Sequence, residues 1–192
     1  MGIWTVSDVP DLFRALGDLL VDVFTGMPRC SGELDHHIVI SGDVEGRPGY
    51  HLLAPGYSRR VREVGSGVTW DFEFKVGAHS SVHGLCLGRI AGHQTLEERA
   101  DGMIGDLSAR RGALPAIPPA ASELAGCPAV GYTLMFHEGT LMTQWQFDHD
   151  CWAFMATLFR GPGDGPDADQ LGRAALATWT WLPDDDVAVP AP

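Results

Sequence analysis

The chain has 192 residues, of which 45% are hydrophobic, and a formal net charge of −12 with only 13 Lys and Arg. This length suits one domain with a substantial core, and the acidic charge disfavours nucleic acid and anionic membrane surfaces as partners. No stretch approaches the ~20 apolar residues of a membrane span, and no secretory signal is visible at the N-terminus. We therefore expect a cytoplasmic protein, with a single domain over residues 1–183 and a disordered acidic tail at 184–192.

The first predicted element is an amphipathic helix over residues 7–25, outside the main body of the domain at 35–183. Ser7 is a suitable N-cap, and Pro10 fits the first turn because its missing N–H costs nothing there. The apolar face of this helix includes Leu12, Leu16, Leu20 and Phe24. This face either packs on the domain's own sheet or contacts a partner protein or a second copy of the chain.

Strands are predicted next, at 35–41, 50–56, 68–76 and 82–91. The third is the clearest, because apolar residues alternate with polar ones along its whole length. Its polar side, with Asp71, Glu73 and Lys75, is predicted to be a solvated face. The alternative is a pair of catalytic carboxylates.

A second helix follows from a capping box at Thr95–Glu98, in which each residue satisfies a backbone N–H of the other. The helix ends at Gly112, after the cations Arg110 and Arg111, which suit the negative end of the helix dipole. The stretch 114–121 is rich in Pro and Ala, and it predicts a stiff connector.

Residues 124–160 predict a three-stranded antiparallel meander, because three β-preferring runs are separated by two short polar breaks. In the middle strand Trp145 and Phe147 point one way, whereas Gln144 and Gln146 point towards a wetter face. The last strand is apolar on both sides, so we expect it to be central and covered on both faces. A final helix then begins near Asp167 or Asp169, and a short strand at 181–183 closes the domain.

Three motifs resemble the PsbP-like fold group, which includes the photosystem P-subunit family, the DcrB family and LpqN-type lipoproteins. They are the stretches at 88–100, 124–130 and 177–183, so the resemblance covers roughly the last hundred residues. It implies an α+β fold, an α/β/α sandwich around an antiparallel sheet. It also implies a mostly non-enzymatic role in assembly or in binding other proteins. The lipoprotein signal of LpqN-type members is absent, and the helix at 7–25 lies outside the pattern of the group.

Candidate residues for chemistry are dispersed along the sequence. The histidines considered as acid–base groups are His36, His37, His83 and His149. His149 lies between two aspartates, so with a distant Cys or His it is also a candidate zinc ligand; exposed turn residues are the simpler interpretation. The four cysteines form no CxxC pair and are interpreted as reduced and mostly buried, with a disulfide or metal pair as the alternative. No motif for a phosphate, a dinucleotide or a catalytic serine is present, so we expect neither a cofactor nor a bound metal.

An aromatic-lined pocket is the remaining alternative to an ordinary core. Its candidate lining residues are Trp70, Phe72, Trp145 and Trp152.

Two hypotheses of function follow from the sequence. The first is a non-catalytic domain that binds another protein, or itself as a homodimer, as an adaptor, assembly factor or chaperone-like partner. The second is a small enzyme or ligand-binding protein that uses such a pocket with histidines as acid–base groups.

Overall fold

The computed structural model describes residues 32–42, 46–56, 58–62, 69–90, 92 and 94–183, with the backbone alone for 58–62 and 69–70. The helix predicted at 7–25, with its Leu12, Leu16, Leu20 and Phe24, lies outside the described residues. So does the tail at 184–192.

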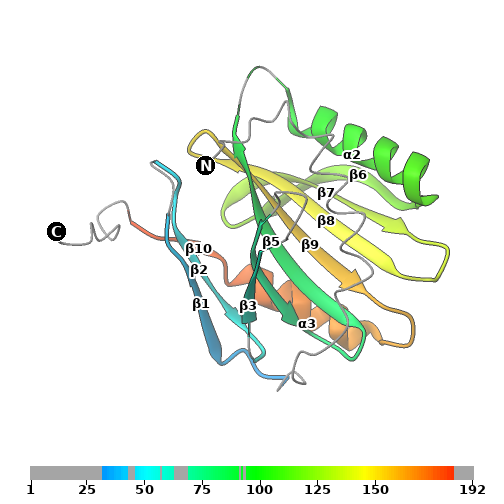
Figure 1. Cartoon of the computed structure of the whole chain (residues 1–192), viewed down its shortest axis with the longest axis horizontal. Helices are drawn as coiled ribbons and strands as arrows, with labels where there is room; N and C mark the ends of the chain where they lie inside the picture. Colours follow the sequence, from blue (N-terminus) through cyan, green and yellow to red (C-terminus); the bar gives the residue numbers. More distant parts are fainter. Residues whose placement is uncertain are drawn as a thin grey trace.

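A seven-stranded antiparallel sheet forms the centre of the molecule, with strand order β3-β4-β5-β9-β8-β7-β6 (Figure 1). Its strands are β3 (Ser58–Arg62), β4 (Thr69–Lys75), β5 (Ser80–Arg89), β6 (Leu114–Leu124), β7 (Cys127–Met135), β8 (Leu141–His149) and β9 (Trp152–Arg160). The predicted meander is present as β7, β8 and β9. The apolar strand β9 pairs with β5 on one side and β8 on the other, so it is central as predicted.

A smaller sheet of three strands lies beside the large one, in the order β1-β2-β10. Its strands are β1 (His36–Ile40), β2 (Tyr50–Ala54) and β10 (Thr180–Trp181). The sequence predicts these segments as strands but does not indicate that they form a sheet of their own. The end of the chain pairs with β2 because Thr180 and Trp181 lie opposite His51 and Tyr50.

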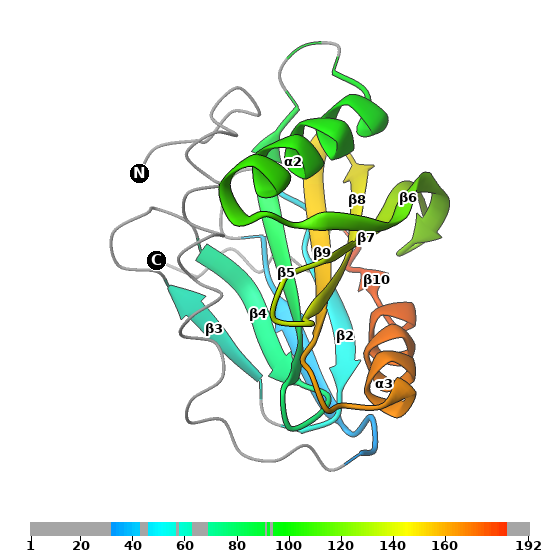
Figure 2. The ribbon, with the colours of Figure 1, turned by 90° about the vertical axis from the view of Figure 1, so that its right-hand side faces the viewer.

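The large sheet is covered on both faces (Figures 1 and 2). Helix α2 (Leu96–Arg111) packs on one face, and helix α3 (Pro166–Ala177) with the small sheet packs on the other. The predicted α+β fold, an antiparallel sheet flanked by helices, is confirmed. α3 approaches the sheet closely at Gly172, where an added Cβ would lie 2.7 Å from Leu158 Cδ1.

The ends of α2 are those that the sequence predicts. Thr95 Oγ1 accepts a hydrogen bond from the Glu98 amide at 3.2 Å, and the Glu98 carboxylate accepts one from the Thr95 amide at 2.9 Å. Gly112 ends the helix in the left-handed conformation at φ 63°. This helix is therefore specified by local sequence.

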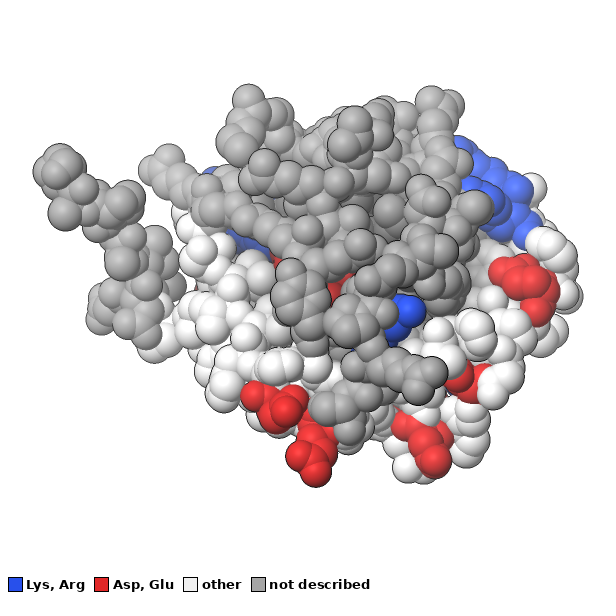
Figure 3. All heavy atoms as spheres, turned by 60° about the horizontal axis from the view of Figure 1, so that its bottom comes forward, with Lys and Arg blue, Asp and Glu red and all other residues white. Residues whose placement is uncertain are grey.

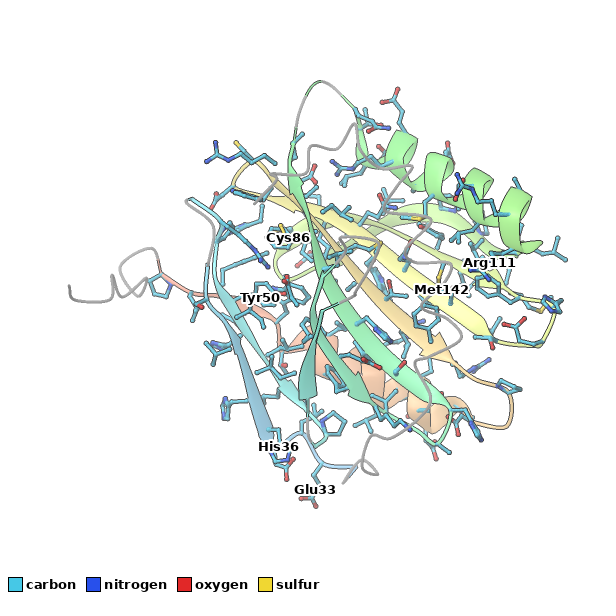
Figure 4. The ribbon with its side chains drawn as sticks, in the orientation of Figure 1. Glu33, His36, Tyr50, Cys86, Arg111 and Met142 are labelled. Atoms are coloured by element: carbon cyan, nitrogen blue, oxygen red, sulfur yellow. The ribbon has the colours of Figure 1, made fainter. Side chains whose placement is uncertain are left out.

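The two faces of the sheet have different cores. The α3 face is aromatic, and Trp179 stacks on Tyr50 with ring centroids 4.2 Å apart. Tyr50 points from β2 into the space between the two sheets (Figure 4). The α2 face is built mainly from Leu and Met side chains, including Met103, Leu107 and Met155.

The prediction that one face of β4 and one face of β8 are exposed to solvent is wrong. Gln144 is fully buried and Gln146 is 1% exposed, and the carboxylate side chains of Asp71 and Glu73 are also buried. The physical reason is that both faces of the sheet are covered, so the polar side of an alternating strand faces protein. These buried polar groups are tolerated where they find hydrogen bonds or ion pairs, as Asp71 does with Arg47 and Tyr50.

The predicted stiff connector at 114–121 is also wrong, because these residues belong to β6. β6 is an edge strand, so it needs backbone hydrogen bonds on one side alone, and proline is tolerated at such a position. The pairing with β7 shifts register between Pro115 and Ile117 and again between Ile117 and Ala120. Beyond Ala120 the pairing is regular up to the turn at Ala125 and Gly126.

Candidate functional site

Exposed apolar side chains gather at one margin of the large sheet. In the part of the chain that the structure describes, four large hydrophobic side chains are exposed, and three belong to the β6–β7 hairpin. They are Leu114, Ile117 and Met135, which are 60%, 54% and 43% exposed. Leu114 lies directly opposite Met135 across the two strands. We call these three residues the apolar edge.

The second half of β6 borders a cavity of about 390 Å³. One wall is the turn and strand end at 122–126, and the opposite wall is α3 from Arg173 to Ala177. Trp145 of β8 and Trp179, which follows α3, complete the lining. We call this space the indole cavity. It lies between elements that are far apart in the sequence, because α3 folds back across the end of the meander.

The side chain of Trp145 is held between two neighbours. An added Cβ on Gly131 would lie 3.2 Å from Trp145 Nε1, so the indole rests directly on the β7 backbone. On the other side, the Arg173 guanidinium lies over the ring at 5.1 Å from its centroid, a cation–π contact. Arg173 Nε also donates a hydrogen bond to Asp169 Oδ2 at 2.7 Å. The cation is thus fixed at the mouth of the cavity.

Trp179 contributes a buried polar group to the same site. The residue is 4% exposed, and its indole Nε1 has no hydrogen-bond partner among the described residues. Buried N–H groups without a partner are uncommon in proteins. The neighbouring Trp181 contrasts with it, because its Nε1 donates to the Ala125 carbonyl at 2.9 Å.

The residues proposed from sequence for an aromatic pocket are separated. Trp145 lines the indole cavity, whereas Phe72 is 1% exposed and stacks on Phe74 in the aromatic core. Trp152 is also buried, and its Nε1 donates to the Gly46 carbonyl at 2.7 Å. The side chain of Trp70 lies outside the described part. Sequence reasoning missed Arg173, whose only local signal is its i,i+4 spacing from Asp169, and it did not propose Trp179 for a pocket.

The four candidate histidines do not come together. His36 and His37 are exposed neighbours on β1, and Figure 4 shows His36 at the outer end of the small sheet. His83 is fully buried on β5, where its Nε2 lies 2.8 Å from Ser81 Oγ. His149 lies at the end of β8. None of the four lines the indole cavity.

The structure does place a cysteine and a carboxylate beside His149. Cys127 Sγ lies 3.6 Å from His149 Nδ1, and Asp150 Oδ2 lies 3.2 Å from Nε2. The imidazole stacks on Trp181 with centroids 3.8 Å apart. Burial raises the pKa of the Cys127 thiol, and nearby carboxylates raise it further, so the thiol is protonated at neutral pH. The described residues include no group of three or more His, Cys, Asp or Glu able to hold a metal.

A row of polar side chains crosses the α2 face of the sheet, one from each of five adjacent strands. Its members, in register, are Glu73, His83, Thr157, Gln144 and Tyr132. All are at most 1% exposed. Tyr132 donates to Gln144 Oε1, and Gln144 Nε2 donates to Thr157 Oγ1 at 3.0 Å. Burial raises the pKa of Tyr132, so its hydroxyl keeps its proton as a donor. Three members of the row, Tyr132, Gln144 and Thr157, are thus bonded to one another, which favours a structural role for them over a binding one.

Among the described residues visible in Figure 3, charged side chains of both signs lie in separate groups. A basic group lies at the upper right of this view, and separate acidic groups lie along its lower margin. No described helix is long and apolar enough to span a membrane.

Comparison with known proteins identifies the fold. No protein-family model matches the chain, and no curated protein matches it. Among solved structures, it is similar to LpqN of Mycobacterium tuberculosis, a protein involved in cell envelope biogenesis, with 12% identity and a TM-score of 0.52 over 77% of this chain and 91% of that one. It is also similar to the cyanobacterial PsbP (CyanoP) of Synechocystis sp. PCC 6803, with 12% identity and a TM-score of 0.54 over 82% and 99% of the two chains. The resemblance to the PsbP-like fold is therefore confirmed as a likeness of fold.

Proposed function

We propose that this chain is a non-catalytic accessory domain that binds another protein through the apolar edge, as an adaptor, assembly factor or chaperone-like partner. The observation that carries the proposal is the concentration of Leu114, Ile117 and Met135 on one hairpin. Single exposed hydrophobic residues are normal on protein surfaces, whereas a group of them marks an interaction site.

The backbone of β6 adds a second means of contact. β6 is the last strand of the large sheet, and no described strand pairs with its outer side. An exposed edge of this kind can take up an extended segment of a partner by main-chain hydrogen bonding. The segment best suited to this is Ala120–Leu124, which contains no proline and pairs regularly with β7. The first half of the strand then contributes apolar contact through Leu114 and Ile117.

The fold agrees with this proposal. One solved structure of similar fold belongs to a protein involved in cell envelope biogenesis, and the resemblance seen in the sequence implies mostly non-enzymatic roles. The partner is another protein or a second copy of this chain. The helix at 7–25, through Leu12, Leu16, Leu20 and Phe24, is a further proposed contact.

Native mass spectrometry of the protein purified from its own source tests the proposal. We expect a second polypeptide at fixed stoichiometry with the wild-type chain and its loss with the double variant Leu114→Ser, Ile117→Ser. Val39→Ser is the matched control, because Val39 is 62% exposed but lies on β1, in the other sheet. A wild-type chain that is always a bare monomer, or a partner that survives the double variant, would contradict the proposal.

A second candidate function is the binding of a small ligand in the indole cavity. Trp145 supports this candidate, because its side chain lines the indole cavity, whose volume is about 390 Å³. An enzymatic form of this candidate needs at least two of the histidines to converge on the cavity. His36, His37, His83 and His149 lie on β1, β5 and β8 and do not support it.

A further inference from the structure

We propose that the indole cavity binds a carboxylate carried on an apolar body, such as a small hydrophobic acid or the apolar C-terminal residue of a polypeptide. The inference rests on the second candidate function above and names the chemistry of its ligand. It does not depend on the apolar edge.

The charge that recognises the ligand is Arg173. Its guanidinium lies over Trp145, and its Nε donates a hydrogen bond to the Asp169 carboxylate, so two contacts position the group beside the cavity. The two terminal nitrogens have no hydrogen-bond partner among the described residues, and 47% of the side chain is exposed. These nitrogens can therefore donate to an incoming anion without breaking a contact within the fold. A planar guanidinium matches a carboxylate particularly well.

The second donor is the indole N–H of Trp179. It is buried, has no described partner and belongs to the lining of the cavity. The nitrogen itself is covered, so a ligand in the cavity would reach it only by displacing a neighbouring side chain of the lining. A ligand oxygen would then supply the hydrogen bond that the fold leaves unmade. The Arg173 terminal nitrogens and the Trp179 N–H belong to residues of the same lining, and together they suit a group with two acceptor oxygens.

The remaining lining selects an apolar body with a single negative charge. The walls beyond the two donors are the rings of Trp145 and Trp179 with Leu124, Leu176 and Ala177. Glu123 also borders the cavity, and Arg173 is the one cation among the described residues of its lining. Arg173 is already paired with Asp169, so a monoanion adds one negative charge beside the pair, whereas a phosphate would add a second charge close to Glu123 inside a protein whose net charge is −12. The cavity volume of about 390 Å³ fits a body the size of one large side chain.

The test uses purified full-length protein and two pairs of probes in calorimetric and NMR titrations. The first pair is 3-phenylpropionate and its amide, and the second is N-acetyl-Ala-Phe with a free carboxylate and the same peptide amidated. In each pair we expect the acid to bind at least about tenfold more tightly, because a hydrogen bond to a charged group is lost in the amide. The Trp179 indole N–H resonance, assigned through Trp179→Phe, should shift with the acids.

Two arginine variants distinguish recognition of the carboxylate by Arg173 from a general effect of positive surface charge on binding. Arg173→Gln should reduce the affinity of each acid to that of its amide. Arg110→Gln is the matched control, because Arg110 is 45% exposed and forms the same kind of i,i+4 pair, with Asp106, on the other helix. It should leave binding unchanged. The double variant Leu114→Ser, Ile117→Ser should also bind the acids normally, so failure of the apolar-edge proposal and failure of this inference are distinguishable.

Each outcome decides the inference. Tighter binding of 3-phenylpropionate indicates a free small acid as the natural ligand class, and tighter binding of the peptide acid indicates a polypeptide C-terminus; both support the inference. Equal affinity for acid and amide, acid binding that survives Arg173→Gln, or no binding of any probe at millimolar concentration would overturn it.

Discussion

Gln144 and Thr157 lie directly opposite each other on β8 and β9, and the Gln144 amide donates to the Thr157 hydroxyl at 3.0 Å. Both side chains are fully buried. A shift of register by one residue would place Ala156 or Leu158, both from the α3 face, opposite Gln144. The polar row across the α2 face therefore helps to fix the pairing of the central strands.

Replacing Gln144 by Leu should destabilise the protein by about 1–3 kcal/mol, because the hydroxyls of Tyr132 and Thr157 each lose a partner in a buried environment. The measurement is the free energy of unfolding from urea titration. Thr157→Val removes the other half of the pair, and the double variant should show a coupling of about 0.5–3 kcal/mol. Strict additivity of the two substitutions would show that the hydrogen bond contributes nothing.

Glycine to alanine should have opposite effects at two positions. An added Cβ at Gly84 would lie 2.1 Å from Phe72 Cε1 on the neighbouring strand, so Gly84→Ala should destabilise by about 1–3 kcal/mol. Gly105→Ala in α2 meets nothing within 4 Å, and it should stabilise by about 0.5–1 kcal/mol.

A second substitution can show why Gly84→Ala destabilises the protein. Combining Gly84→Ala with Phe72→Leu should recover part of the loss, because the smaller side chain leaves room for the new methyl group. Thermal unfolding of the three variants gives the comparison. If Phe72→Leu adds its own full loss to that of Gly84→Ala, steric contact with this ring is not the reason.

Asp164 should make stability depend on pH. Partial burial raises the pKa of its carboxyl, but hydrogen bonds from Ser80 Oγ at 2.6 Å and the His79 amide at 2.7 Å outweigh burial and leave the pKa below its usual value. A depressed folded pKa contributes stability that is present above the unfolded pKa and is lost as pH falls through the folded value.

The difference in unfolding free energy between wild type and Asp164→Asn should therefore be constant near neutral pH. It should shrink once the pH falls below about 4, the ordinary value for Asp. Urea titrations across this range measure the difference. A difference that grew on acidification would show that the pKa is raised in the folded state.

Trp145→Ala should destabilise by about 3 kcal/mol, near the lower end for a buried aromatic, because part of the ring borders a cavity instead of packed side chains. Trp145→Phe keeps contact with Gly131 and should lose less. Chemical denaturation of both variants provides the test. A loss below about 1 kcal/mol for the alanine variant would mean that the ring contributes little to the core.

Local sequence patterns predicted the parts of the fold that depend on neighbouring residues. The capping box at Thr95 and Glu98 predicted where α2 begins, and the alternation of apolar residues predicted β4. Alternation shows that one face of a strand is apolar, but it does not reveal what covers the other face. This is why Gln144 and Glu73 were assigned to solvent although both are buried.

The wrong prediction of a connector at β6 and the missed contact between Trp145 and Arg173 have a related cause. Three prolines dominate the local signal of 114–121, whereas its pairing with β7 depends on residues further along the chain. Trp145 was recognisable as a large aromatic on a strand. Its contact with Arg173 arises only because α3 packs against the sheet near Trp145, and this contact could not be read from spacing.

The prolines of β6 also limit how large an assembly this edge can form. An open strand of eleven residues would otherwise be a template on which identical chains add without end. Pro115, Pro118 and Pro119 lack the N–H that a continuous ladder requires, and the two register shifts bend the strand away from a regular edge. A partner can pair only with the short regular segment at the end of the strand. Complexes formed here should therefore close at one partner for each chain, and the protein should not grow into fibres.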